Sequence, residues 1–236
     1  DASVEDASAD VGPRDGSVDA VPPDVAPGDL LLWLRADLGV EVSGDAVTAW
    51  RDQSGWANDA TQGTAAFRPR RLTSNLPPVV DFDGIDDHLA VRAGFADFTG
   101  GFTCFVFART RKTTPFHAAR FIDFAPTFGS LTSSVLFVRF GAGDELFFQT
   151  YQTGTPGPYT DAPGAVVDGA WTVYSVVMQP GSPTKLVDAT VFTNGVARAS
   201  GQVHPPDVVN RASNLIGRSN LGGIDISPII LLLIIF

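Results

Sequence analysis

The amino-acid sequence predicts an all-β protein, an antiparallel two-sheet jelly-roll sandwich that follows a disordered acidic segment. Short apolar stretches rich in Val, Ile and Phe recur along the chain, and no helical period persists beyond two turns. The 24 Gly and 17 Pro indicate many turns between short elements. Asn194-Gly195, directly before Val196, is typical of a two-residue β-hairpin, because a type I′ turn needs positive φ at two successive residues.

The first 28 residues differ in composition from the rest of the chain. They consist mainly of Asp, Ala, Val, Ser, Pro and Gly. The formal net charge is −10; eight acidic residues against Arg14 place −7 within residues 1–29 and leave −3 for the remainder. Such a segment buries too little apolar surface to offset its ordering entropy. We therefore expect residues 1–28 to form an extended spacer and residues 29–236 to form one sandwich domain.

Each predicted strand is a run of β-branched, aromatic or aliphatic residues bounded by turn-forming residues. In chain order, these runs are 30–35, 78–82, 88–91, 102–109, 120–124, 135–140, 146–151, 171–178, 189–193, 196–199, 214–217 and 229–236.

Aromatic residues in the first third of the chain predict where the core lies. We expect the indoles of Trp33 and Trp50 in the core, and the alternation of Trp33 with its Leu neighbours is typical of a strand that inserts into the sandwich. The run 102–109 is apolar at both alternating positions, which predicts a central strand covered on both faces. Cys104 lies inside that run and is the only cysteine, so we expect a buried, inert thiol.

The runs near the middle and the end of the chain predict two connections. The glycine-rich segment 141–144 predicts a hairpin between 135–140 and 146–151. The run 229–236 consists of Ile and Leu up to its final Phe, which predicts a strand covered on both faces. It is shorter than the ~20 residues that a membrane-spanning helix needs, so we expect no membrane span.

Three blocks of sequence resemble a known family. They read LWLRAD at 32–37, WRDQSG at 50–55 and FDGIDDHL at 82–89. Together they are similar to the concanavalin A-like lectin/glucanase superfamily, and in particular to the laminin-G-like domains of bacterial exported proteins. The resemblance covers roughly residues 29–227. It implies a jelly-roll sandwich that is secreted or displayed on the cell surface as one module of a larger exported protein. It also implies that 229–236 is the closing strand beside the first strand, and that the C-terminus is truncated, because relatives usually continue past this strand with polar residues.

The third block contains three candidate metal ligands, Asp83, Asp86 and Asp87. The carboxylates of Asp86 and Asp87 are adjacent and repel each other, and a calcium ion with oxygen ligands would relieve that repulsion. The resemblance also implies calcium, since many relatives bind it at the rim of the sandwich. The alternative interpretation is that Asp83 and Gly84 form a turn, in which a short carboxylate accepts hydrogen bonds from backbone amides. The same interpretation applies to Asp52 in the second block.

The functional prediction is a non-catalytic extracellular module that binds carbohydrate or a cell-surface glycoconjugate, as the resemblance implies. Sugar sites place aromatic faces next to hydrogen-bonding groups. The candidate ligand-binding residues are Trp56, Asp144, Gln149, Tyr151 and Tyr159. The acidic segment and the mildly acidic remainder would both repel a polyanion, so we expect no nucleic-acid partner.

Two alternatives remain open. A cell-surface protein-interaction or structural module with no small ligand would use the Pro- and Gly-rich segment 153–164 as a contact loop. A degenerate or active glycoside hydrolase is the other. Glucanases of the superfamily that this chain resembles carry two nearby Glu on one strand, but the only Glu residues after the spacer are Glu41 and Glu145, on unrelated segments. His88, His117 and His204 lack metal-ligand spacing. We therefore predict no catalytic residues.

Overall fold

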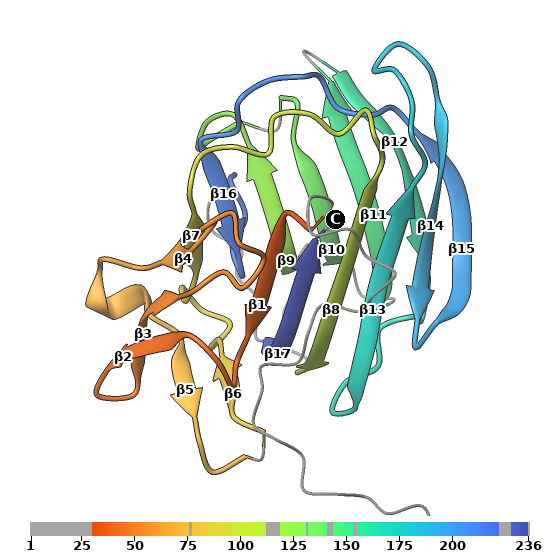
Figure 1. The fold of residues 1–236 in the computed structure, drawn as a ribbon. Helices are drawn as coiled ribbons and strands as arrows, with labels where there is room; N and C mark the ends of the chain where they lie inside the picture. Colours follow the sequence, from red (N-terminus) through yellow and green to blue (C-terminus); the bar gives the residue numbers. More distant parts are fainter. Residues whose placement is uncertain are drawn as a thin grey trace, which may run out of the picture.

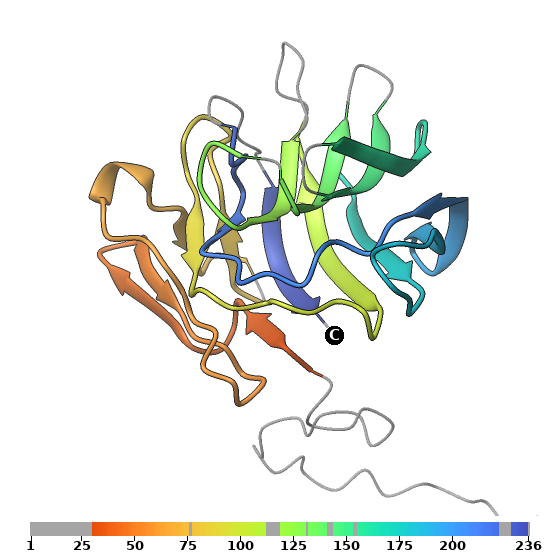
Figure 2. The same ribbon diagram turned by 90° about the horizontal axis from the view of Figure 1, so that it is seen from above.

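Two antiparallel β-sheets face each other in this computed structural model, which describes residues 30–75, 77–111, 119–130, 132–140, 144–152, 155–221 and 228–235. In Figure 1 one sheet lies in front of the other, and Figure 2 shows the two layers from above. The predicted spacer, residues 1–28, lies outside the described residues, as does His117.

The elements are almost all strands, with one short 3₁₀ helix, η1, among the described residues. In chain order they are β1 Leu32–Arg35, β2 Val40–Ser43, β3 Ala46–Trp50, β4 Ala60–Thr61, η1 Ala65–Phe67, β5 Arg70–Leu72, β6 Val79–Asp81, β7 Leu89–Val91, β8 Phe102–Thr110, β9 Ala119–Ala125, β10 Val135–Phe140, β11 Glu145–Gln152, β12 Thr155–Ala162, β13 Trp171–Met178, β14 Val187–Thr193, β15 Val196–Val203, β16 Ser213–Ile216 and β17 Pro228–Ile235.

The strand order confirms the predicted jelly-roll sandwich. The first sheet runs β15-β14-β13-β8-β17-β1. The second runs β12-β11-β10-β9-β16-β7-β4. Strands β2, β3, β5 and β6 lie at one side of the sandwich and connect the two sheets through pairings with β4 and β17. No helix among the described residues is long and apolar enough to span a membrane.

The space between the sheets holds one large apolar core. Side chains at alternate positions of β8, including Cys104 and Val106, are fully buried in it. The prediction of burial on both faces of this strand is only half right, because the intervening side chains, including Phe107, are half-buried. The Phe107 ring lies 5.2 Å from that of Trp171 on the outer face. Burial raises the pKa of the Cys104 thiol, as expected for an inert cysteine.

The two predicted core tryptophans differ. Trp50 is fully buried, and its Nε1 donates a hydrogen bond to the backbone oxygen of Arg35 at 2.7 Å. Trp33 was expected in the core, but it lies half-buried on the outer face, with the Arg35 guanidinium 5.5 Å from its ring. The period of two is the reason: Leu32 and Leu34 point inward, so the residue between them must point outward.

Several connections were predicted correctly and several strands were missed. The Asn194-Gly195 turn has φ of 50° and 75° and joins β14 to β15. Strands β10 and β11 form the second predicted hairpin, although residues 141–143 lie outside the described residues. The sequence did not predict β2, β3, β4 or β5. The segment expected as a contact loop, 153–164, contains β12, which pairs with β11.

Strand β17 confirms the predicted closing strand beside β1. Leu32 of β1 pairs with Ile235 on one side of β17, and Cys104 of β8 pairs with the same residue on the other. Ile235 is fully buried in the main core. Phe236 lies outside the described residues. The strand is therefore a central member of the first sheet.

We expect deletion of residues 229–236 to abolish the soluble monomer, because it would leave β1 and β8 as two unpaired edges. Ile235→Ala, which keeps the strand, should lower the free energy of unfolding by about 2–5 kcal/mol. Deletion of residues 1–28 is the control and should leave the melting temperature unchanged. Size-exclusion chromatography and thermal unfolding measure both effects. A stable, monomeric 229–236 deletion would contradict this account of β17.

Candidate functional site

Strand β10 carries apolar side chains on both of its faces. Val135 and Phe137 belong to the main core. Leu136 and Val138, at the alternate positions, form a second cluster with Phe147 of β11 on the opposite face. Because successive side chains of a strand point to opposite faces, this second cluster lies on the outside of the second sheet.

A pocket with a volume of about 420 Å³ opens on this outer face. That size is within the range typical of ligand sites. Its lining combines apolar, aromatic, amide and charged side chains from β9 to β12: Arg120, Leu136, Glu145, Phe147, Gln149, Tyr151, Tyr159 and Asp161.

One side of the pocket is aromatic. Tyr159 is 54% exposed, and its ring centroid lies 4.9 Å from that of Phe147 at an interplanar angle of 33°. The pairing of β11 with β12 sets this arrangement, with Gln149 opposite Tyr159 and Phe147 opposite Asp161. The two rings therefore contact each other on one face of the sheet, and together they give the pocket an aromatic surface.

Gln149 supplies a fixed amide to the pocket. The side chain is 7% exposed, and its Nε2 donates a hydrogen bond to the backbone oxygen of Gly157 at 2.7 Å. A Cβ atom at position 157 would collide with the backbone oxygen of Thr150, so this close approach of β12 to β11 requires glycine. The side-chain carbonyl oxygen of Gln149 accepts no hydrogen bond from any of the described residues.

A buried ion pair lies next to these residues. Arg120 Nε donates to Asp123 Oδ2 at 3.1 Å, and Asp123 is fully buried. Asn220 adds two bonds to the same carboxylate, from its backbone N at 3.0 Å and its Nδ2 at 2.8 Å. The charge of Arg120 is therefore compensated by a carboxylate that the fold holds in place.

Tyr151 contributes a hydroxyl that remains protonated. Burial raises its pKa, and of the two nearby charges the Arg120 guanidinium lowers it while the Asp123 carboxylate raises it. A phenol with a raised pKa stays neutral at physiological pH and can donate a hydrogen bond.

Three of the five predicted ligand-binding residues, Gln149, Tyr151 and Tyr159, line the pocket together. Asp144 is not among the lining residues and lies in the turn before β11, where its backbone oxygen accepts a bond from Val166 N. Trp56 is also outside the pocket lining, 51% exposed in the loop before β4.

Sequence reasoning missed the other lining residues, which are Arg120, Leu136, Glu145, Phe147 and Asp161. The alternation along β11 could have identified two of them, because every second residue from Glu145 to Tyr151 faces the pocket.

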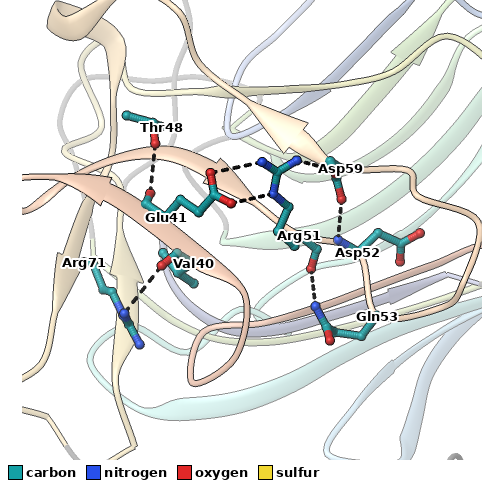
Figure 3. A network of polar contacts seen from close by, with 8 residues as sticks. All are labelled: Val40, Glu41, Thr48, Arg51, Asp52, Gln53, Asp59 and Arg71. Carbon is teal, nitrogen blue, oxygen red and sulfur yellow. Dashed lines mark hydrogen bonds and ion pairs between the residues drawn. The ribbon is translucent and has the colours of Figure 1, made fainter.

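The second sequence block has a structural role, and Figure 3 shows part of its polar network. Arg51 forms ion pairs with Glu41 at 2.8 Å and with Asp59 at 2.6 Å. Asp52 accepts hydrogen bonds from the backbone N of Trp33 and of Ser54, each at 2.9 Å. These bonds confirm the turn interpretation of Asp52 and tie the loop to β1.

The candidate metal ligands form a tight turn. Asp83, Asp86 and Asp87 each place one carboxylate oxygen within 4.8 Å of the other two. Asp83 Oδ1 also caps the backbone N of Ile85 at 2.8 Å, and Asp87 Oδ2 accepts from Asp83 N at 2.9 Å, so the turn interpretation of Asp83 is confirmed. The remaining carboxylate oxygens fit a calcium ion in charge and type, but they supply only part of its usual six to eight ligands.

Comparisons with known proteins match the chain to one family. The family model of the concanavalin A-like lectin/glucanases superfamily matches residues 83–227, which include most of the third sequence block but neither of the first two. A search of the curated proteins found no match.

Two solved structures share the fold. Domain 4 of AbnA, a GH43 extracellular arabinanase from Geobacillus stearothermophilus solved with arabinotriose, has a TM-score of 0.62 at 17% identity, over 88% of this chain and 91% of that chain. The Trypanosoma rangeli sialidase has a TM-score of 0.51 at 12% identity, over 89% of this chain and 30% of that chain. At these identities the likeness concerns the fold alone.

The buried carboxyl of Asp87 predicts a pH effect on stability. Burial, its largest cause, raises its pKa to about 6, against about 3.9 in an unfolded chain. Between these values the folded protein binds more protons, so this group lowers the free energy of unfolding as the pH rises from about 4 to 6. Asp87→Asn keeps a side-chain oxygen that can accept the hydrogen bond from Asp83 N, but it removes the titrating carboxyl group.

We therefore expect the stability of Asp87→Asn relative to the unaltered protein to be higher at pH 7.5 than at pH 4.5. Denaturant unfolding at both pH values measures this difference. A difference that does not change with pH would contradict the assignment to Asp87.

We expect any calcium ion bound by this chain to use the same turn. Calcium should then raise the melting temperature, with a stabilisation of about 2.7 kcal/mol at a hundredfold excess over Kd, and Asp86→Asn should abolish the rise. Asp45→Asn, which removes an exposed acid from the β2–β3 hairpin, is the matched control. Calorimetry that detects no heat of calcium binding would exclude the metal from this turn.

Proposed function

This chain belongs to the concanavalin A-like lectin/glucanase superfamily, and on that basis we propose that it is a non-catalytic extracellular module that binds carbohydrate or a glycoconjugate. The proposed site is the pocket on the outer face of β9 to β12. The observation that carries the proposal is the exposed Tyr159 ring, supported by Phe147, directly beside the buried amide of Gln149.

This combination suits the chemistry of a sugar. A sugar ring has an apolar face of C–H groups and a rim of hydroxyls, so it needs a flat apolar surface next to directional hydrogen-bonding groups. Tyr159 and Phe147 offer the surface. Gln149 offers an amide oxygen, and Tyr151 offers a hydroxyl that can donate or accept.

The comparison with the arabinanase domain supports carbohydrate as the ligand class. That domain was solved in complex with arabinotriose, and it shares the fold over most of both chains. The identity of 17% gives no information on which residues bind or on which sugar this chain takes. The argument for the site therefore rests on the pocket itself.

The structure adds one observation to the hydrolase alternative. Glu145 and Asp161 come from neighbouring strands and line the same pocket, a pairing that a search along single strands does not find. Glycosidases need two carboxyls about 5–10 Å apart across the scissile bond. We propose binding without cleavage, and the test below therefore includes an assay for cleavage.

The proposed setting is outside the cell. We propose that the domain acts as one module of a larger exported protein, which it would attach to a glycan or to a cell-surface glycoconjugate. The protein-interaction alternative relied on segment 153–164 as a free loop, but β12 pairs with β11 there and directs Tyr159 to the pocket.

We expect Tyr159→Ala to weaken glycan binding at least tenfold, which corresponds to about 1.4 kcal/mol, because the ligand loses its stacking surface. Trp56→Ala is the matched control, since it removes an equally exposed aromatic outside the pocket. A glycan array identifies the ligand, and titration calorimetry measures both variants.

Two results would overturn the proposal. Absence of binding to any glycan would leave the protein-interaction alternative. Release of shorter oligosaccharides during incubation with the bound glycan, lost in Glu145→Gln, would show a hydrolase instead of a binding module.

A further inference from the structure

The charges around the pocket are unequal. Arg120 is the one cationic residue among the described residues of the lining, and Asp123 compensates its charge from within the fold. The lining also includes the carboxylates of Glu145 and Asp161, and neither makes a hydrogen bond or ion pair in the part of the chain that the structure describes. Within the described part of the chain, two negative charges at the pocket therefore have no counter-charge.

The strand register places these two carboxylates on the same side of the sheet. Phe147 lies directly opposite Asp161, and Glu145 is two residues before Phe147 on the same face of β11. Glu145 and Asp161 are thus diagonal neighbours on paired strands, and the backbones of such residues are about 7–8 Å apart. A single ammonium group can contact two such carboxylates, since each N–H···O bond to a charged oxygen is about 2.8 Å long.

The other lining groups agree with a ligand that donates hydrogen bonds. The carbonyl oxygen of Gln149, on a side chain that is 7% exposed, has no recorded partner among the described residues. It is an acceptor, as both carboxylates are. An acidic sugar would bring a third negative charge to this site, where the partial burial of both carboxylates makes charge repulsion stronger than in bulk water.

Resting on the proposed function, we propose that the pocket selects glycans with a free, protonated amino group, such as a non-acetylated amino sugar. The sugar ring packs on Tyr159, and its ammonium group binds between Glu145 and Asp161. Sugars that carry carboxylate or sulfate groups are rejected by the same two side chains.

The test compares three trisaccharides that share ring type and β1→4 linkage and differ at C2: glucosamine, N-acetylglucosamine and glucose. Titration calorimetry at pH 6 and low salt should show the glucosamine ligand binding at least tenfold more tightly than the other two. The difference should shrink in 1 M NaCl, where charges are screened beyond about 3 Å.

Variants assign the preference to the two carboxylates. Glu145→Gln and Asp161→Asn keep the side-chain shape and should each lower the ratio of the affinity for the glucosamine ligand to the affinity for the glucose ligand. Asp45→Asn removes the same charge far from the pocket, in the β2–β3 hairpin, and should leave the preference unchanged.

The outcomes separate this inference from the proposed function. Equal affinity for the three ligands, or an array on which only neutral or acidic glycans bind, overturns the preference for an amine but leaves a carbohydrate-binding module. Absence of binding to every glycan, including cationic ones, overturns both.

Discussion

The register of β11 between β10 and β12 is the constraint on which both the core and the pocket depend. In an antiparallel sheet, a slip of one residue would exchange the side chains of the two faces. Phe148 of β11 lies opposite Phe137 of β10, and both rings are buried in the main core. The adjacent Phe147 lies opposite Val138 and is held on the outer face. The pairing that buries one phenylalanine therefore places the next one where it can support Tyr159.

The charged groups near the pocket divide into those that the fold uses and those that it leaves available. Removing one partner of a buried ion pair costs about 3–5 kcal/mol, because the other charge stays buried. Asp123 has this structural role: it pairs with Arg120 on its own strand and accepts from Asn220, 97 residues later in the chain. The carboxylates of Glu145 and Asp161 are only half-buried and have no such role among the described residues. Partial exposure lets water stabilise them until a ligand replaces it.

The fold could be predicted from the sequence where apolar runs and turn residues agree, as at the Asn194-Gly195 hairpin and at β17. The sequence failed where the local pattern is ambiguous. Pro158 made β12 resemble a loop, yet proline is tolerated at sheet edges and bulges, and here the register shifts between Gln149 and Tyr151. The prediction that Trp33 lies in the core was wrong for a different reason. Its size suggested burial, but the alternation fixed by its leucine neighbours determines its face, so periodicity outweighs residue type on a short strand.

The site could be predicted only in part, because residue type and residue placement are different kinds of information. Tyr159 and Gln149 could be chosen as aromatic and amide side chains near turn-rich sequence. Glu145 and Asp161 could not be paired in the same way, since they lie on different strands and only the β11–β12 register brings them to one face. The sequence argument against catalysis missed the same pair, because it considered only two carboxylates along a single strand. A missing motif excludes the one arrangement that the motif describes. It does not exclude carboxylates that strand pairing brings together, and for this reason the charge of the pocket has to be derived from the register.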